Sequence, residues 1–313
     1  MDDEPFKTLR SVAVVGSVSV DHNVIGDRTF LKLGGVASYA GLTYRRHGVS
    51  TWVVCNVAPA ETAILTPLTA EGIQVLNGAT PRTTRFVNRI CGNRRFQETP
   101  ALAAPIRQQQ VDAVLKNVDG VHLGPLHPED IEAQVFARLQ GVDTLVVLDV
   151  QGLVRKNEQG RIVPAVSEHL AAALKAARIV KADQEELGAI LDAYGSKIET
   201  LMDRFDIAEW VVTAGPTGGC IHVRGGRPHP YRPAPIDISV DPTGAGDVFL
   251  AAYTAARFRQ RQTVAAASRH AASLSAGHAA GRYLPASRLD LAHMAAVLES
   301  GEVPIVDNNI NEG

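Results

Sequence analysis

The sequence has little of what marks secreted, membrane or disulfide-rich proteins. Its 313 residues include only three cysteines, Cys55, Cys91 and Cys220, which are too few and too widely spaced for a disulfide framework or a CxxC metal site. No apolar run approaches the ~18 residues needed to span a bilayer. The N-terminus is acidic, where a secretory signal would be basic and then apolar. We therefore expect a cytoplasmic protein with no membrane partner.

Basic charge is not in excess either. Lysine and arginine number 31 against 33 acidic residues, a formal net charge of −2, and no dense basic run is present to follow a phosphate backbone. Nucleic acid is therefore not an expected partner. The content of hydrophobic residues, 45%, is high enough for a large core and excludes a disordered or fibrous chain.

Several motifs that would define an enzyme class are missing. The chain has no GxxxxGK[ST] motif, which excludes a P-loop enzyme, and no HExxH among its histidines. The segment GSVSVD (16–21) follows the first predicted strand where a dinucleotide-binding enzyme would carry GxGxxG. A dinucleotide-dependent oxidoreductase is therefore disfavoured.

Short apolar runs alternate with helical stretches along most of the chain. Because these runs are continuously apolar, they predict strands buried on both faces, as in a parallel sheet. An α/β fold with a mostly parallel sheet follows. The runs are residues 12–15, 51–55, 121–123, 144–150, 178–180 and 210–213.

Sequence motifs typical of helix N-termini mark the starts of two predicted helices. A capping box at Ser196–Glu199 precedes apolar residues at helical spacing up to Phe205, and Pro128 is expected to open a helix that ends at Gly141.

Two segments break this alternation. Asp27–Leu33 and Thr83–Gln97 read as strands, the second as an antiparallel hairpin with its turn at Cys91–Asn93. The hairpin is rich in arginine and does not look like core, which indicates a lid or a subunit contact. An ordinary solvated hairpin is the alternative. The arginines are Arg85, Arg89, Arg94 and Arg95.

The strongest local signal is the segment DPTGAGD, Asp241–Asp247, which leads directly into a predicted helix. A Gly-Ala-Gly turn at a helix N-terminus lets backbone N–H groups converge on an anion, and the helix dipole reinforces the attraction. Asp247 is then placed to accept a proton beside a phosphate-sized anion hole. The alternative is that Asp247 is only a helix-start residue.

The segment DPTGAGDVFLAAY resembles the C-terminal signature of the ribokinase-like (PfkB) family of carbohydrate kinases. Further segments resemble the family in the same order, and the match runs from about residue 12 to about residue 285. They are Val14–Asp21, Gly34-Gly35, the lid segment TTRFVNRICGNRRFQ, Asp149–Arg155, Lys181–Glu186 and Thr213–Gly218.

The resemblance implies a three-layer ribokinase-like α/β fold with a mostly parallel central sheet and a small β lid. Residues 1–313 would form a single kinase domain with lid segments at approximately 17–34 and 80–106. It also implies an ATP-dependent kinase of a small sugar or cyclic polyol, with dimerisation through the lid as a candidate assembly.

The resemblance further assigns roles. Asp247 would be the general base, and the amides of Gly244, Ala245 and Gly246 would receive the phosphoryl charge. Glu186 would organise Mg²⁺ through water, which fits the preference of that ion for few carboxylates, waters and phosphates. A monovalent cation such as K⁺, bound near Asp241, is a further candidate. The expected nucleotide contacts are Asp183, Glu186, Thr213, Gly215 and Gly218; the expected acceptor contacts are Asp21, Gly34, Gly35, Tyr39, Gln151 and Arg155.

Two positions depart from the family pattern. Asp183 replaces the asparagine of the Asn-x-x-Glu motif, which adds a negative charge near the donor. Tyr39 stands where many members carry asparagine, so ribokinase-type pentose recognition is disfavoured, and the motifs most resemble the myo-inositol kinase branch. A nucleoside kinase and a non-catalytic ligand sensor remain the alternatives.

Overall fold

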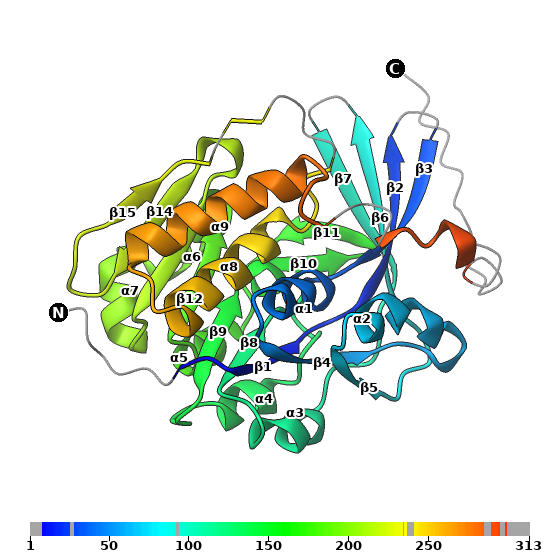
Figure 1. The fold of residues 1–313 in the computed structure, drawn as a ribbon, viewed down its shortest axis with the longest axis horizontal. Helices are drawn as coiled ribbons and strands as arrows, with labels where there is room; N and C mark the ends of the chain where they lie inside the picture. The colour runs from blue at the N-terminus through cyan, green and yellow to red at the C-terminus, as the bar shows by residue number, and fades with distance from the viewer. Residues whose placement is uncertain are drawn as a thin grey trace.

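The structure is a computed structural model that describes residues 8–25, 28–91, 94–233, 235–236, 241–284, 289–294 and 298. Within these residues the chain forms a large sheet between two helical layers and a second sheet that rises from one side (Figure 1).

In the described residues the large sheet has the strand order β15-β14-β13-β12-β9-β8-β1-β4-β5. Every pairing from β13 to β5 is parallel, whereas β14 and β15 add an antiparallel edge. All six predicted strands are confirmed within a few residues. The bounds are β1 (Ser11–Val15), β4 (Ser50–Asn56), β5 (Gln74–Gly78), β8 (Gly120–Leu123), β9 (Leu145–Asp149), β12 (Ile179–Asp183), β13 (Glu209–Thr213), β14 (Gly219–Val223) and β15 (His229–Tyr231).

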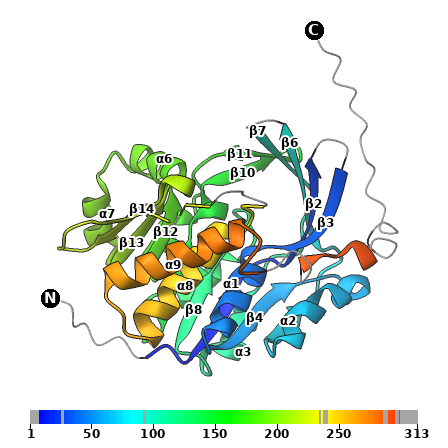
Figure 2. The same ribbon diagram turned by 45° about the horizontal axis from the view of Figure 1, so that its top comes forward.

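The second sheet, in the order β10-β11-β7-β6-β2-β3, is called the lid below. The expected segments supply β2, β3, β6 and β7, and the turn residues Gly92 and Asn93 lie outside the described residues. The hairpin of β10 and β11 was not predicted and continues the sheet beside β7 (Figure 2). The bounds are β2 (Ser19–Ile25), β3 (Arg28–Gly34), β6 (Thr84–Cys91), β7 (Arg94–Ala101), β10 (Arg155–Glu158) and β11 (Arg161–Pro164).

Helices cover both faces of the large sheet and enclose two apolar clusters. One cluster includes side chains of α1, α8 and α9, and the other includes side chains of α3 to α7. The longer helices alternate with strands because continuous apolar strands need cover on both sides. The bounds are α1 (Val36–Arg46), α2 (Thr66–Ala70), α3 (Gln108–Leu115), α4 (Ala133–Arg138), α5 (Leu170–Ala176), α6 (Gln184–Tyr194), α7 (Ile198–Phe205), α8 (Ala245–Thr254) and α9 (Val264–Ala279).

Both predicted helix starts were wrong in detail. The helix expected from Pro128 begins only at Ala133, because the Asp130 carboxylate accepts hydrogen bonds from the Ser17 and Leu126 amides and holds residues 127–130 in a turn. The helix expected to be capped by Ser196 has Lys197 at its N-cap, with no side-chain cap. Its apolar face is buried as predicted, including Phe205.

The expectation that the lid arginines avoid the interior was wrong for Arg85. This side chain is 4% exposed and forms an ion pair with Glu61, which is itself 8% exposed. An arginine can be buried when its charge is paired, so the charge of Arg85 did not by itself show whether the side chain is exposed or buried. Arg89 is half-buried, and the side chains of Arg94 and Arg95 lie outside the described set.

Candidate active site

The predicted glycine turn opens helix α8, as expected. Gly244 is the N-cap residue, with φ of 79°, a left-handed conformation that favours glycine. A Cβ on Gly244 would stand 2.5 Å from ring carbons of Tyr39, so the turn also needs glycine for space. The Ala245 amide donates to the Pro242 carbonyl at 3.0 Å, which leaves the amides of Gly244 and Gly246 as the anion-binding candidates.

Asp247 lies in the first turn of α8 and lines a pocket. Burial raises the pKa of its carboxyl to about 7, with further increases from the charges of Asp149 and Glu186, while Lys181 lowers it. A carboxylate with a pKa near neutrality is suited to accept a proton from a hydroxyl at the moment of reaction.

Next to Asp247 lies a buried group of charges, of which the sequence analysis assigned roles to Glu186 and Arg155 but not to Lys181 or Asp149. Lys181, in the middle of β12, is 5% exposed, and its Nζ lies 3.1 Å from Asp149 Oδ2 and 3.9 Å from Glu186 Oε2. Arg155 lies 4.0 Å from the Glu186 carboxylate. The parallel sheet brings Lys181 and Asp149 together because β9 and β12 are neighbours and these two residues are paired in register.

Asp183 has a local structural role. It is the N-cap of α6, where its carboxylate accepts from the Glu186 amide at 2.8 Å and the Glu186 carboxylate accepts from the Asp183 amide at 2.8 Å. This reciprocal capping box explains why an acid is tolerated in place of asparagine, since the helix dipole stabilises negative charge at this end. It also holds Glu186 in a fixed position.

Most of the expected acceptor residues meet in one pocket with Gly244 and Asp247. Strands of the lid, the starts of α1 and α8, and the segments after β8 and β9 all contribute to this pocket. Gly34 lies behind it, because a Cβ there would stand 2.4 Å from the Asp21 carboxylate. The lining residues are Ser19, Asp21, Gly35, Val36, Tyr39, Phe86, Gln97, Leu126, Gln151, Arg155, Thr243, Gly244 and Asp247.

Gln97 is a pocket residue that the sequence analysis missed. On β7 it faces Asn88 of β6, and the amides of Asn23, Asn88 and Gln97 form a hydrogen-bonded row, at 2.8 Å and 3.0 Å. Arg155 Nη1 donates to the side-chain oxygen Oε1 of Gln97 at 3.3 Å. The amide side chains are visible in the sequence, but only the pairing of β6 with β7 shows that Asn88 and Gln97 face each other.

Asp21 and Tyr39 are both buried in this pocket. Asp21 is 5% exposed and accepts from the Ser19 hydroxyl at 2.7 Å. Tyr39 is 2% exposed and packs edge-on to His278, whose Nε2 lies 2.8 Å from the Thr243 carbonyl oxygen. Tyr39 therefore packs under the glycine turn as well as lining the pocket.

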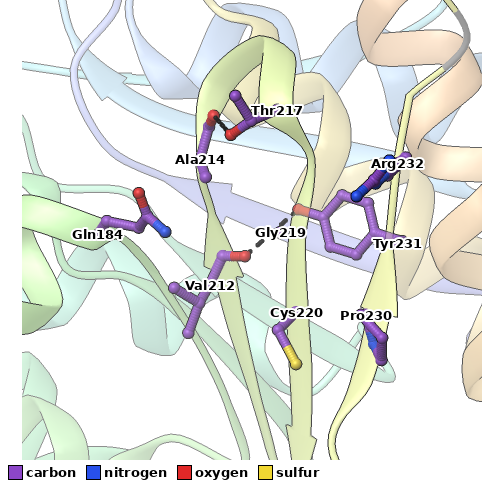
Figure 3. Close-up of a pocket in the computed structure, with 9 residues that line it drawn as sticks. All are labelled: Gln184, Val212, Ala214, Thr217, Gly219, Cys220, Pro230, Tyr231 and Arg232. Carbon is purple, nitrogen blue, oxygen red and sulfur yellow. Dashed lines mark hydrogen bonds between the residues drawn. The ribbon is translucent and has the colours of Figure 1, made fainter.

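A second hollow, of about 600 Å³, lies beside the Thr213–Gly218 loop. In Figure 3 the side chains of Val212, Cys220 and Pro230 follow one another across β13, β14 and β15, while Gln184 lies beyond Val212. The loop contributes Ala214 and Thr217 to the lining, whereas Thr213, Gly215 and Gly218 are not lining residues. Nucleotide contact by these three residues stays a prediction.

The turn of this loop is tight. Gly218 has a φ of 104°, and the Ala214 amide donates to its carbonyl oxygen at 2.7 Å. A Cβ on Gly218 would stand 2.2 Å from the Tyr231 carbonyl oxygen, so β15 packs directly against the loop.

Residues 31–285 match the model of the pfkB family of carbohydrate kinases. This chain belongs to that family. No curated protein sequence matches closely enough to add a relative.

Solved structures agree on the fold. A pyrophosphate-dependent kinase of the ribokinase family, in complex with sulfate, is similar with a TM-score of 0.78 and 21% identity, over 88% of this chain and 98% of that one. A Burkholderia thailandensis nucleoside kinase with inosine gives 0.71 at 16% identity, over 88% and 94%. Thermotoga maritima ribokinase gives 0.67 at 15% identity, over 92% and 99%. The family member described here therefore has the ribokinase-like α/β fold.

Within the described residues, no helix is both long and apolar enough to cross a membrane.

Proposed function

We propose that this family member transfers the γ-phosphoryl group of Mg·ATP to a hydroxyl of a small sugar or cyclic polyol, with Asp247 as general base. The observation that carries the proposal is that Asp247 and Gly244 line the same pocket as Asp21, Gln151 and Arg155. A proton acceptor, an anion-binding turn and hydroxyl-binding groups thus meet around one cavity.

In the proposed reaction the acceptor hydroxyl attacks the terminal phosphorus of the donor. Its O–H proton passes to the Asp247 carboxylate, a new P–O bond forms, and the bond to the leaving phosphate breaks, with the electron pair leaving on that phosphate. The amides of the glycine turn stabilise the phosphoryl oxygens, and the lid excludes water that would compete with the acceptor.

The pocket favours a compact acceptor. Its volume is about 90 Å³, against about 600 Å³ for the hollow beside the donor loop. Asp21, Gln97 and Gln151 supply hydrogen-bonding groups, while Tyr39 and Phe86 supply apolar surface for ring C–H groups. A nucleoside is the second candidate, since a nucleoside kinase is among the similar structures.

ATP is the favoured phosphoryl donor. The hollow beside the Thr213–Gly218 loop has room for the base and sugar of a nucleotide, which favours ATP. Pyrophosphate is the second candidate, because similar structures include a pyrophosphate-dependent kinase in complex with a pyrophosphate analogue and myo-inositol.

The deciding experiment combines each donor, Mg·ATP or Mg·pyrophosphate, with a panel of cyclic polyols, sugars and nucleosides, and follows phosphate ester formation by ³¹P NMR. We expect turnover with a polyol or sugar. Turnover of nucleosides alone would replace the acceptor class, and tight binding of ligands without any product would favour the non-catalytic sensor.

The donor assignment predicts the effect of filling the second hollow. In Cys220→Trp an indole would occupy the space between Val212 and Pro230, so the KM for ATP should rise at least about tenfold while turnover with pyrophosphate is unchanged. Cys220→Ala is the matched control and should retain the wild-type KM. An unchanged KM for ATP in a folded tryptophan variant would place the base elsewhere.

Mg²⁺ fits the Glu186 side of the site as an outer-sphere ion. The described residues contain no group of three or more side chains able to hold a metal by themselves. Mg²⁺ commonly keeps several waters and relies on substrate phosphates, so one positioned carboxylate is enough. Glu186 would hold the waters of the ion, and the metal would supply charge neutralisation of the donor phosphates.

Glu186→Gln should therefore need several-fold more Mg²⁺ for half-maximal rate, because the carboxylate that orders the waters of the ion is lost. The glutamine oxygen can still accept from the Asp183 amide, so the unfolding temperature should change little. Glu185→Gln, the same chemical change at an exposed residue of the first turn of α6, is the matched control. A magnesium titration unchanged by Glu186→Gln would remove Glu186 from the metal site.

A lysine already occupies the position next to Asp241. Lys32 of lid strand β3 lies 2.5 Å from the Asp241 carboxylate, which leads into the glycine turn. Because an ammonium group supplies the positive charge here, we expect the rate to be the same in K⁺, Na⁺ or choline salts. Lys32→Met should lower the rate and make it increase with K⁺; a wild-type rate that depends on K⁺ would contradict this.

Dimerisation through the lid stays a prediction.

A further inference from the structure

Lys181 is the buried charge that the mechanism above does not use. Its ammonium group reaches the glycine turn, since a Cβ added to Gly246 would stand 3.3 Å from Nζ. The same nitrogen lies 3.1 Å from Asp149, whose side chain is fully buried. The lysine therefore links the end of the large sheet to the N-terminus of α8.

The surrounding charges explain why the ammonium stays protonated. The carboxylates of Asp149 and Glu186 lie 3.1 Å and 3.9 Å from Nζ and favour the charged form of the ammonium group. The lysine is thus a buried positive charge that is paired with Asp149 and Glu186.

The charge balance of the site also supports a phosphate-binding role for Lys181. Two cations, Lys181 and Arg155, face the four carboxylates of Asp149, Asp183, Glu186 and Asp247. An anionic donor entering such a site needs a fixed positive charge at the point where its phosphoryl group lies.

A purely structural role for Lys181 explains these contacts less well. A buried ion pair contributes little net stability, because the desolvation of both charges offsets their attraction. Lys181 is also not enclosed by its carboxylate partners alone, since its Nζ and Cε are the atoms that a Cβ on Gly246 would meet, at 3.3 Å and 3.5 Å. The side chain extends toward the anion-binding turn.

We propose that Lys181 is a catalytic residue that contacts the transferred phosphoryl group, together with the amides of Gly244 and Gly246, and that Asp149 is the positioning residue that holds it there. The lysine moves no proton; it binds the phosphoryl oxygens while Asp247 receives the hydroxyl proton. This inference rests on the proposed function for the identity of the reaction, but anion binding by Lys181 can be measured without turnover.

The test compares Lys181→Met with the double variant Lys181→Met/Asp149→Asn. The single variant leaves Asp149 buried and unpaired and can fail to fold, whereas the double variant removes both charges and keeps both shapes. Lys175→Met removes an exposed lysine of α5 and is the matched control. Binding of pyrophosphate and of Mg·ATP is measured by calorimetry without acceptor, and thermal unfolding checks the fold.

We expect the double variant to bind both donors about 10- to 100-fold more weakly, as for the loss of one hydrogen bond to a charged group, and Lys175→Met to match the wild type. In turnover assays kcat should fall while the KM for the acceptor stays within about threefold. Wild-type donor affinity in a folded double variant would overturn the proposal, as would a wild-type protein that binds neither donor. Donor binding that depends on Lys181 without any turnover would instead contradict the proposed reaction alone.

Discussion

Replacing Asp247 by asparagine should lower kcat by roughly 10²–10⁴, the usual contribution of a general base. Asparagine keeps the shape and much of the hydrogen bonding of the carboxylate but cannot take a proton. Donor and acceptor affinities should change little, because phosphate binding is assigned to backbone amides and to Lys181, which the substitution leaves in place. The measurement is kcat at saturating acceptor and Mg·donor, with calorimetric binding of both ligands to the variant.

Retention of more than about a tenth of the wild-type kcat, a loss below ~1.4 kcal/mol, would remove Asp247 from the base role. The best control is Asp192→Asn on the surface of α6, which makes the same chemical change outside the site and should leave kcat unaltered.

The raised pKa of Asp247 adds a pH dependence. Because the base must be ionised and its pKa is about 7, kcat/KM of the wild type should fall below pH 7 by up to tenfold per pH unit. The folded protein also holds this proton more tightly than the unfolded chain does, so the contribution of Asp247 to stability is full at low pH and is lost as pH rises through 7. Asp247→Asn should therefore gain stability relative to the wild type more at pH 8 than at pH 5.

Replacing Gly244 by alanine should reduce kcat/KM by about 10²-fold or more, because misplacing the reacting groups by an ångström is enough for such a loss. The added methyl group would stand 2.5 Å from the Tyr39 ring, and φ of 79° is unfavourable for alanine. The turn and the first residues of α8 must then move, which shifts the amides and Asp247 together. Steady-state kinetics and thermal unfolding measure both consequences.

A double variant separates the two causes. Gly244→Ala/Tyr39→Ala removes the ring that the methyl group would meet, so it should recover part of the rate if the contact dominates and none if the backbone conformation dominates. Gly141→Ala is a control for backbone strain alone, since its φ is 70° and a Cβ there would meet nothing within 4 Å; it should lose stability without losing kcat. A Gly244→Ala enzyme with normal kcat/KM would show that the turn does not position the reacting groups.

Features that depend on local chemistry were predictable from the sequence. Apolar runs such as Thr144–Val150 gave the parallel strands, because continuous apolarity reflects burial on both faces. The Asp241–Asp247 turn could be placed at a helix start because the glycines and the acid in the first turn are favoured there by local backbone geometry and by the helix dipole. The helix after Pro128 was misplaced because Asp130 makes its hydrogen bonds to Ser17, more than a hundred residues earlier.

The sequence by itself determined the α/β class, the glycine turn that opens a helix carrying Asp247, and the family, since each depends on short segments whose residues are neighbours in the chain. The tertiary structure alone decided which side chains share the pocket. Gln97 reaches it only through pairing of β7 with β6, and Lys181 meets Asp149 only because β12 lies beside β9. The burial of Arg85 likewise required Glu61 as a partner. The cost of burying a charge depends on where its partner lies in space, and spacing along the chain does not specify that.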